Sequence, residues 1–197
     1  MVRFSEVRKS LAYYFTEPAV RLLAKTPIRP DTLSWFGFLV TVGAAALILT
    51  GHLLAAGFMV LFAGFFDMLD GALARYTGRI TRFGGILDSV LDRLSEAVLL
   101  LGILGWYLYS GSQSATLILL VCLALIFSPL VSYLRARAEA LGLECQLGLF
   151  TRAERVIVLA LGLLLNQIVI ALAIIAFLSF LTFGQRLFYI WQQTRAS

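Results

Sequence analysis

Six long apolar runs, separated by short polar connections, dominate the hydrophobic pattern of the chain. They cover residues 32–50, 53–75, 84–109, 115–135, 154–166 with its flanks, and 167–186. A helix that crosses a bilayer needs about 20 mostly apolar residues, which these runs supply. Only Asn166-Gln167 separates the fifth run from the sixth. The pattern therefore predicts an all-α integral membrane protein with six transmembrane helices.

The first 30 residues have a different pattern, in which apolar and aromatic residues alternate with Lys and Arg. This alternation predicts an N-terminal amphipathic juxtamembrane helix over residues 1–30, with its basic side toward anionic lipid headgroups. A flexible basic tail is the alternative. Residues 31–197 would then form one transmembrane domain.

Composition and charge support the membrane interpretation. The 197 residues are 60% hydrophobic, with a mean hydropathy of +0.92. A pI of about 9.6 would suggest nucleic acid in a soluble protein, but the position of the charges argues against that partner. All 16 Lys and Arg residues lie near alternate connections, and the turns near residues 51, 111 and 166 contain none. By the positive-inside rule, we expect a multi-pass plasma-membrane protein with both termini in the cytoplasm.

Four aspartates interrupt the apolar pattern around the second connection. Asp67 and Asp70 are spaced i,i+3, and Asp88 and Asp92 are spaced i,i+4, so each pair shares a helix face. A short polar turn containing Gly78 makes the two helices antiparallel neighbours. Charged residues within membrane segments are costly and mark functional sites. This acidic stretch is therefore the candidate site, on the cytoplasmic side.

Small residues accompany the aspartates, because Gly71, Ala74 and Gly84 lie on the same helix faces. They leave room for a ligand against the backbone, and Arg75 is placed to meet a phosphate. Carboxylates in one groove need a cation, and Mg²⁺ binds through carboxylates and substrate phosphates. The pattern favours metal-assisted phosphoryl transfer, with a two-metal clamp possible. The alternative is structural ion pairs with neighbouring arginines (Arg75, Arg79, Arg82 and Arg93).

The spacing Asp67-x2-Asp70-Gly71-x2-Ala74-Arg75-x8-Gly84-x3-Asp88-x3-Asp92 resembles the complete signature of the CDP-alcohol phosphotransferases. The resemblance implies transfer of a phosphatidyl or similar group from a CDP-linked donor to an alcohol, with release of CMP. It also implies a homodimer and two Mg²⁺ or Mn²⁺ ions. The implied metal ligands are Asp67, Asp70 and Asp88, joined by Asp92, which is also the implied general base. The implied CDP contacts are Asp67, Asp70, Gly71, Ala74, Arg75 and Gly84.

The segment before the first run, Pro30-Asp31-Thr32-Leu33-Ser34, resembles a Pro-Asn-x-x-Thr segment that many family members carry near the nucleotide. Here Asp replaces Asn and Ser replaces Thr. Asp31 is therefore a candidate CDP contact. The alternative for Asp31 is the N-cap of the first helix.

A second basic stretch lies between the fourth and fifth runs, on the same predicted membrane face as the aspartates. Its guanidinium groups are suited to bidentate binding of a phosphate, although positive-inside bias also explains them. Residues 132–155 resemble the family branch that makes phosphatidylinositol phosphate or archaetidylinositol phosphate from inositol phosphate. This resemblance implies that Arg135, Arg155 and a residue near the chain end, Arg186, hold the acceptor phosphate. Further candidates are Arg152 and Arg195.

With CDP-diacylglycerol as donor, the sequence thus predicts phosphatidyl transfer to inositol phosphate. The closest alternative is phosphatidylglycerophosphate synthesis, with glycerol 3-phosphate as acceptor. A cation transporter would not require the Gly71, Ala74, Arg75 and Gly84 framework. A prenyltransferase would need a second pair of acidic motifs elsewhere in the chain, and the sequence contains no such pair. Glu96 continues the Asp88–Asp92 face by one turn, and the sequence leaves open whether it tunes the base or pairs with an arginine.

Overall fold

The computed structural model describes residues 17–111, 114–143, 145 and 148–196, and every regular element in these ranges is helical. The prediction of an all-α protein is confirmed. Each long helix begins within two residues of the start of a predicted apolar run. The six helices are α2 (Pro30–Leu49), α3 (Leu53–Tyr76), α4 (Arg82–Tyr109), α5 (Ala115–Ala140), α6 (Arg152–Leu164) and α7 (Ile168–Ala196).

Of the predicted N-terminal amphipathic helix, residues 1–16 lie outside the described part of the chain. Residues 17–23 are helical and are followed by a turn that leads into α2. Pro30 occupies the first position of α2 and Arg29 occupies its N-cap. The interpretation of Asp31 as the N-cap is therefore wrong, because Pro30 starts the helix one residue earlier and places Asp31 in its first turn.

The helix ends follow from local sequence. Thr81 caps α4, and its Oγ1 accepts a hydrogen bond of 2.9 Å from the backbone N–H of Gly84. Thr151 and Glu154 form a capping box at the start of α6. Asn166 has a φ of 55° and lies between α6 and α7, which confirms the predicted break at Asn166-Gln167. These caps place the polar residues of α4 and α6 directly after defined turns.

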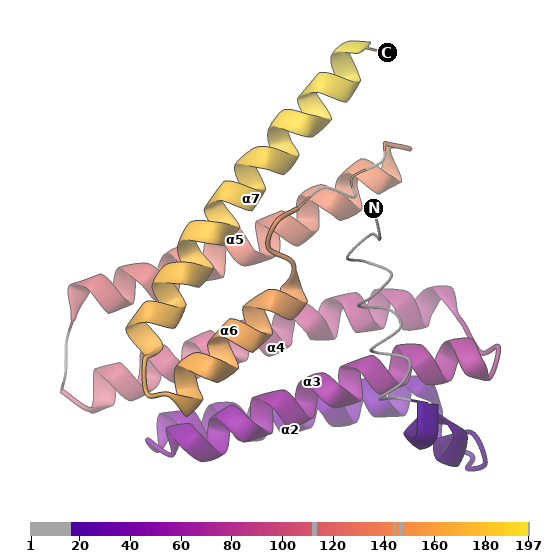
Figure 1. Cartoon of the computed structure of the whole chain (residues 1–197), viewed down its shortest axis with the longest axis horizontal. Coiled ribbons are helices and arrows are strands. Elements are labelled where there is room, and N and C mark those ends of the chain that lie inside the picture. The colour runs from indigo at the N-terminus through magenta and orange to yellow at the C-terminus, as the bar shows by residue number, and fades with distance from the viewer. Residues whose placement is uncertain (1–16, 112–113, 144, 146–147, 197) are drawn as a thin grey trace.

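Helix α2 packs against both α3 and α4, whereas α3 and α4 make no extensive contact with each other within the described residues. The short connection reverses the chain as predicted, but α2 provides the shared packing surface. Helix α6 packs on α3 and α7, and α5 packs on α7 (Figure 1). The main core lies among these helices and includes Ala44, Ile48, Ala56, Val60, Leu100, Ile103 and Leu172. The end of α7 projects away from the layer formed by α2, α3 and α4.

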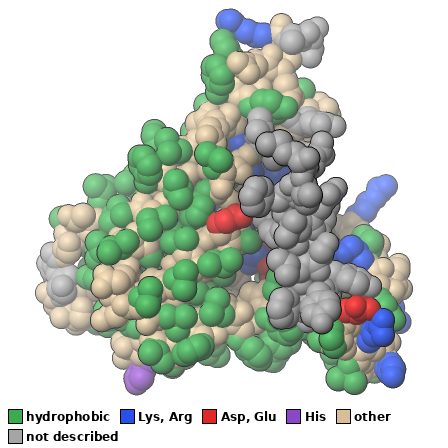
Figure 2. Space-filling view, viewed as in Figure 1, with side chains coloured by type: hydrophobic (Ala, Val, Ile, Leu, Met, Phe, Trp, Pro, Cys, Tyr) green, Lys and Arg blue, Asp and Glu red, His purple; other side chains and the backbone are tan. Residues whose placement is uncertain are grey.

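Four of the described helices are long and apolar enough to cross a membrane: α2, α3, α5 and α7. Helix α6 has 13 residues, and α4 carries five charged residues within its first 15 positions. Large apolar side chains such as Phe58 and Phe177 are exposed on the outside. Green side chains cover much of the face in Figure 2, with charged groups toward the right and top and His52 at the opposite, lower-left end. The chain is therefore a membrane protein.

Gly102 tests the close packing of α4 on α2. A Cβ at residue 102 would lie 3.0 Å from the carbonyl oxygen of Ala45 and 3.3 Å from its Cα. Gly102→Ala should therefore lower stability by about 1–3 kcal/mol, although alanine favours helices. The measurement is thermal unfolding in detergent. The control is Gly184→Ala in α7, where no described atom lies within 4 Å and no loss is expected. Equal melting temperatures for the two variants would contradict the close packing.

Candidate active site

Three of the four predicted aspartates meet in one cluster. Asp67 and Asp70 on α3 and Asp88 on α4 each place a carboxylate oxygen within 4.8 Å of the others. Asp70 is buried, and the other two are partly buried. Three oxygen donors in this arrangement have the chemistry and spacing to hold a hard divalent cation. Asp70 and Asp88 of this cluster face a cavity between α2, α3 and α4.

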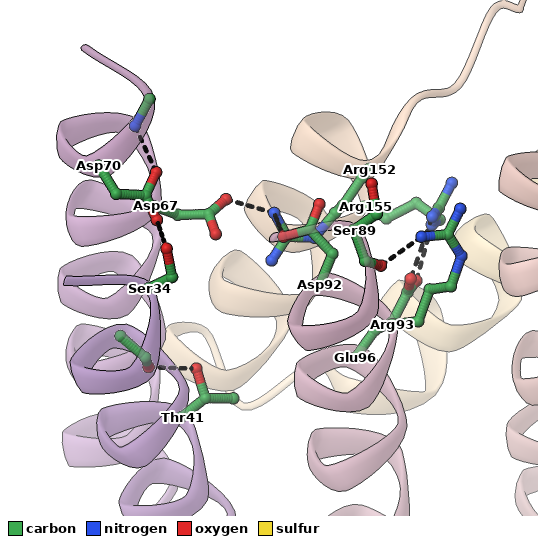
Figure 3. A network of polar contacts seen from close by, with 12 residues as sticks. Ser34, Thr41, Asp67, Asp70, Ser89, Asp92, Arg93, Glu96, Arg152 and Arg155 are labelled. Carbon is green, nitrogen blue, oxygen red and sulfur yellow. Dashed lines mark hydrogen bonds and ion pairs between the residues drawn. The ribbon is translucent and has the colours of Figure 1, made fainter. Parts of the chain in front are cut away.

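Ser34 of α2 fixes the buried member of the cluster. Its hydroxyl donates a hydrogen bond of 2.5 Å to Oδ2 of Asp70, and the backbone N–H of Gly71 donates one of 2.5 Å to Oδ1 (Figure 3). The sequence analysis identified Ser34 only as the residue that stands where many family members have Thr, at the end of the Pro30–Ser34 segment. The structure shows that this segment reaches the aspartates through Ser34.

Asp92 lies outside this cluster and pairs with an arginine from α6. Nη1 of Arg152 lies 2.7 Å from Oδ1 of Asp92 and also donates a hydrogen bond to Oδ2 of Asp67. All three side chains are partly buried. Figure 3 shows Arg152 between the two aspartates. The arginine between these aspartates therefore comes from the second basic stretch, and not from the neighbouring arginines considered in the sequence.

A cavity of about 270 Å³ borders the carboxylate cluster at the start of α2, the end of α3 and the start of α4. Its lining includes most of the predicted CDP contacts, namely Asp31, Asp70, Gly71, Ala74, Arg75 and Gly84, together with Asp88. Asp67 instead lines a mostly apolar cavity between α2, α3, α4 and α6. Most of the signature segment thus lines one pocket, to which Asp70 and Asp88 also contribute.

Gly84 is required by a close approach in this pocket. A Cβ at residue 84 would lie 3.1 Å from Oδ1 of Asp31 and 2.9 Å from Oγ1 of Thr81. The Asp31 carboxylate therefore lies against the first turn of α4, beside the carboxylate cluster. This contact explains in physical terms why the signature has a residue without a side chain at this position.

A second, larger cavity of about 480 Å³ is lined by Asp92. Residues from α4, α5, α6 and α7 line it, and four of the five predicted acceptor arginines are among them: Arg135, Arg152, Arg155 and Arg186. Arg155 is 2% exposed and Arg186 is 4% exposed. The cavity is lined by acids as well, including Asp92, Glu96 and Glu139. Such a concentration of buried guanidinium groups is suited to a phosphate.

Other contacts place these arginines individually. Nη1 of Arg186 donates a hydrogen bond of 2.5 Å to the carbonyl of Val131. The backbone of Gly148 covers the same guanidinium, because a Cβ there would lie 2.6 Å from Nη2 of Arg186. Arg135 pairs with Glu139 at 2.8 Å, and both side chains are about half exposed.

Arg195 lies apart from the cavity-lining residues. Its guanidinium carbon lies 4.1 Å above the ring of Trp191, in the last turns of α7. The structure therefore does not bring Arg195 to the cavity that the other four candidates line, and Arg186 is the described arginine of α7 that reaches it. The long α7 helix explains the separation, because nine positions along a helix span about 13 Å.

A family model for CDP-alcohol phosphatidyltransferases matches residues 28–185 of the chain. The archaetidylinositol phosphate synthase of Methanothermobacter thermautotrophicus is 39% identical over 171 residues, which are 84% of each chain. The phosphatidylinositol phosphate synthase of Mycobacteroides abscessus is 41% identical over 149 residues, 75% of this chain and 67% of the relative.

Solved structures of the Mycobacterium tuberculosis phosphatidylinositol phosphate synthase have the same fold. The structure with CDP-DAG bound superposes with a TM-score of 0.81 at 33% identity, covering 89% of this chain and 93% of that one. The structure in complex with manganese and citrate gives a TM-score of 0.82, with 89% and 88% covered.

Arg152→Gln tests the charge balance between Asp67 and Asp92. The variant leaves these carboxylates without their shared cation, which should cost about 1–3 kcal/mol of stability. The measurement is thermal unfolding with a chelator present, so that no added divalent ion replaces the guanidinium. Arg21→Gln is the control, since Arg21 pairs with Glu17 at the surface and should change stability by less than about 1 kcal/mol. An equally small change for Arg152→Gln would contradict a structural role for the pair.

Proposed function

Because this chain belongs to the CDP-alcohol phosphatidyltransferase family, we propose that it transfers the phosphatidyl group of CDP-diacylglycerol to inositol phosphate, with release of CMP. One observation carries the proposal: α4 presents Asp88 to the carboxylate cluster and Asp92 to the arginine-lined cavity, one turn apart. A metal-dependent donor site and an anion-binding acceptor site therefore meet at one helix. The names of the relatives, which are inositol phospholipid synthases, favour the same acceptor.

The oxygen donors of Asp67, Asp70 and Asp88 fit a divalent cation, and the complex of the mycobacterial relative contains manganese. These residues would hold Mg²⁺ or Mn²⁺, with two ions in the working enzyme and Asp92 near the second. The bound ions would neutralise the pyrophosphate and the charge that develops on the leaving CMP.

The donor would lie with its CDP group in the smaller cavity. Asp31, Gly71, Ala74 and Gly84 leave space along the helix backbones, and Arg75 supplies a positive charge. The mycobacterial relative was solved with CDP-DAG bound. The lipid tails would remain among the apolar faces of the helices and the bilayer. This placement puts the reacting phosphate next to Asp67, Asp70 and Asp88.

The acceptor phosphate would bind in the larger cavity to Arg135, Arg155 and Arg186, with Arg152 nearby. Asp92 lines the same cavity, so it is positioned to accept the proton of the inositol hydroxyl. The hydroxyl oxygen then bonds to the phosphorus attached to diacylglycerol, and the bond from that phosphorus to CMP breaks. The electron pair leaves with CMP, and the transferred proton stays on Asp92 until it is released to solvent.

The same proposal includes the topology. Residues 1–30 form a juxtamembrane segment, and residues 31–197 form one domain whose six helices, α4 and α6 included, cross the plasma membrane. Charged groups gather toward one end of the molecule, which favours a cytoplasmic active site with both termini on that side (Figure 2). The assembly is a homodimer, as the family resemblance implies.

A side-by-side acceptor assay tests the reaction. Purified protein receives CDP-diacylglycerol, a divalent ion, and either radiolabelled inositol phosphate or radiolabelled glycerol 3-phosphate. We expect labelled lipid and CMP with inositol phosphate, and loss of turnover when a chelator removes the ion. Preferential labelling with glycerol 3-phosphate would overturn the proposed acceptor. Divalent-ion uptake into proteoliposomes without CMP release would overturn the enzyme class.

Asp92→Asn tests the general base. The amide cannot take up the hydroxyl proton, so turnover should fall by about 10²–10⁴-fold. Binding of CDP-diacylglycerol should survive, because Asp92 lies outside the cluster formed by Asp67, Asp70 and Asp88. Turnover and donor binding are measured on the same preparation. Loss of donor binding in step with turnover would contradict the assigned role.

A further inference from the structure

Glu96 is a buried acid in the larger cavity to which the proposed reaction gives no role. It lies on α4, one turn beyond Asp92, and its side chain is 10% exposed. A buried carboxylate that faces a phosphate-binding cavity would by itself repel the ligand. Its position therefore requires a reason other than contact with the acceptor phosphate.

The contacts of Glu96 supply that reason. Its Oε1 accepts a hydrogen bond of 2.7 Å from Nε of Arg155, and its Oε2 accepts one of 3.0 Å from Nη2 (Figure 3). Two parallel bonds to one edge of a guanidinium fix both the plane and the rotation of the group. Arg155 is 2% exposed, so its orientation also cannot be set by solvent.

The third guanidinium nitrogen of Arg155, Nη1, takes no part in this pairing with Glu96. Nη1 is buried and has no hydrogen-bond partner among the described residues. An unsatisfied buried donor costs about 1–3 kcal/mol, and a charged one costs more. Arg155 lines the larger cavity, together with Arg135, Arg152 and Arg186. The bidentate pair therefore leaves a charged donor without a protein acceptor beside a cavity suited to an anion.

We propose that Glu96 is a positioning residue: its bidentate pair with Arg155 holds the guanidinium so that Nη1 donates to the acceptor phosphate. The inference rests on the proposed function, because it assumes that the phosphorylated alcohol occupies the larger cavity. Glu96 itself touches neither substrate nor reacting atom. Its contribution is to the orientation of Arg155 and thereby to the affinity for the acceptor.

The direction in which the KM for inositol phosphate changes distinguishes a positioning role of Glu96 from simple repulsion of the phosphate. Removing the Glu96 charge would strengthen phosphate binding if the carboxylate only repelled the anion. If Glu96 orients Arg155, the same change weakens binding, because the guanidinium loses one of its two fixed hydrogen bonds. Glu96→Gln should raise the KM for inositol phosphate about tenfold, the equivalent of one charge-assisted hydrogen bond. The KM for CDP-diacylglycerol should stay within about twofold.

The matched control is Glu17→Gln, which removes the same charge from an arginine pair that lines neither cavity. Glu17 pairs with the exposed Arg21, so its loss should change the KM for inositol phosphate less than about twofold. Glu96→Asp keeps the charge but shortens the side chain by one methylene, and should also raise the acceptor KM. Because it preserves the charge balance, this variant carries the test if Glu96→Gln does not fold.

A double-variant cycle asks whether Glu96 acts through Arg155. Arg155→Gln alone should raise the acceptor KM, and adding Glu96→Gln should then raise it by less than twofold more. Independent, multiplying effects would overturn the positioning role, as would an unchanged or lowered acceptor KM in Glu96→Gln. Wild-type protein that fails to use inositol phosphate would instead overturn the proposed function. The two failures are therefore distinguishable.

Discussion

Carboxylates that lie close together in a membrane protein repel each other, and the surrounding helices must offset that repulsion. Asp67, Asp70 and Asp88 converge although two helices supply them. Helix α2 packs against both α3 and α4 and holds them apart, so the acids meet across a gap and not in a tight helix interface. Ser34 at the start of α2 then satisfies the most buried carboxylate. The same helix therefore supplies the spacing and a hydrogen bond.

Helix α6 supplies the compensating positive charge. Its capping box at Thr151 and Glu154 begins the helix next to the acids. Arg152 then pairs with Asp92, and Arg155 pairs with Glu96. The partners are spaced by three positions on α6 and four on α4, so two successive turns of each helix meet with opposite charges (Figure 3). These pairs fix how a helix of only 13 residues lies against the rest of the protein.

The sequence predicted the helices and the acidic cluster because both depend on local spacing. Apolar runs of membrane length gave six helices at the observed places, and the i,i+3 and i,i+4 spacings placed the aspartates on shared faces. The partners of these aspartates were not predictable in the same way. Arg152 reaches Asp67 from a helix 85 positions along the chain, and nothing in local spacing encodes that contact.

Three positions show the same limit in detail. Asp31 is not an N-cap, because Pro30 starts α2 one residue earlier. The sequence could not exclude Arg195 as a ligand of the acceptor phosphate, because the length and direction of α7 decide whether its last turns reach the cavity. Glu96 continued the acidic face by spacing, but its role depends on the guanidinium opposite it. In each case packing between distant segments, and not periodicity, determines the contact.

The two cavities draw on different halves of the chain. The smaller one is built from α2, α3 and the start of α4, whereas α5, α6 and α7 supply the four candidate acceptor arginines of the larger one, Arg135, Arg152, Arg155 and Arg186. Under the proposed function, selectivity for the nucleotide-linked lipid and selectivity for the headgroup alcohol would therefore be encoded separately. Substitutions in the C-terminal half could then change the headgroup while the nucleotide chemistry is inherited unaltered, which gives a common scaffold a route to many phospholipids.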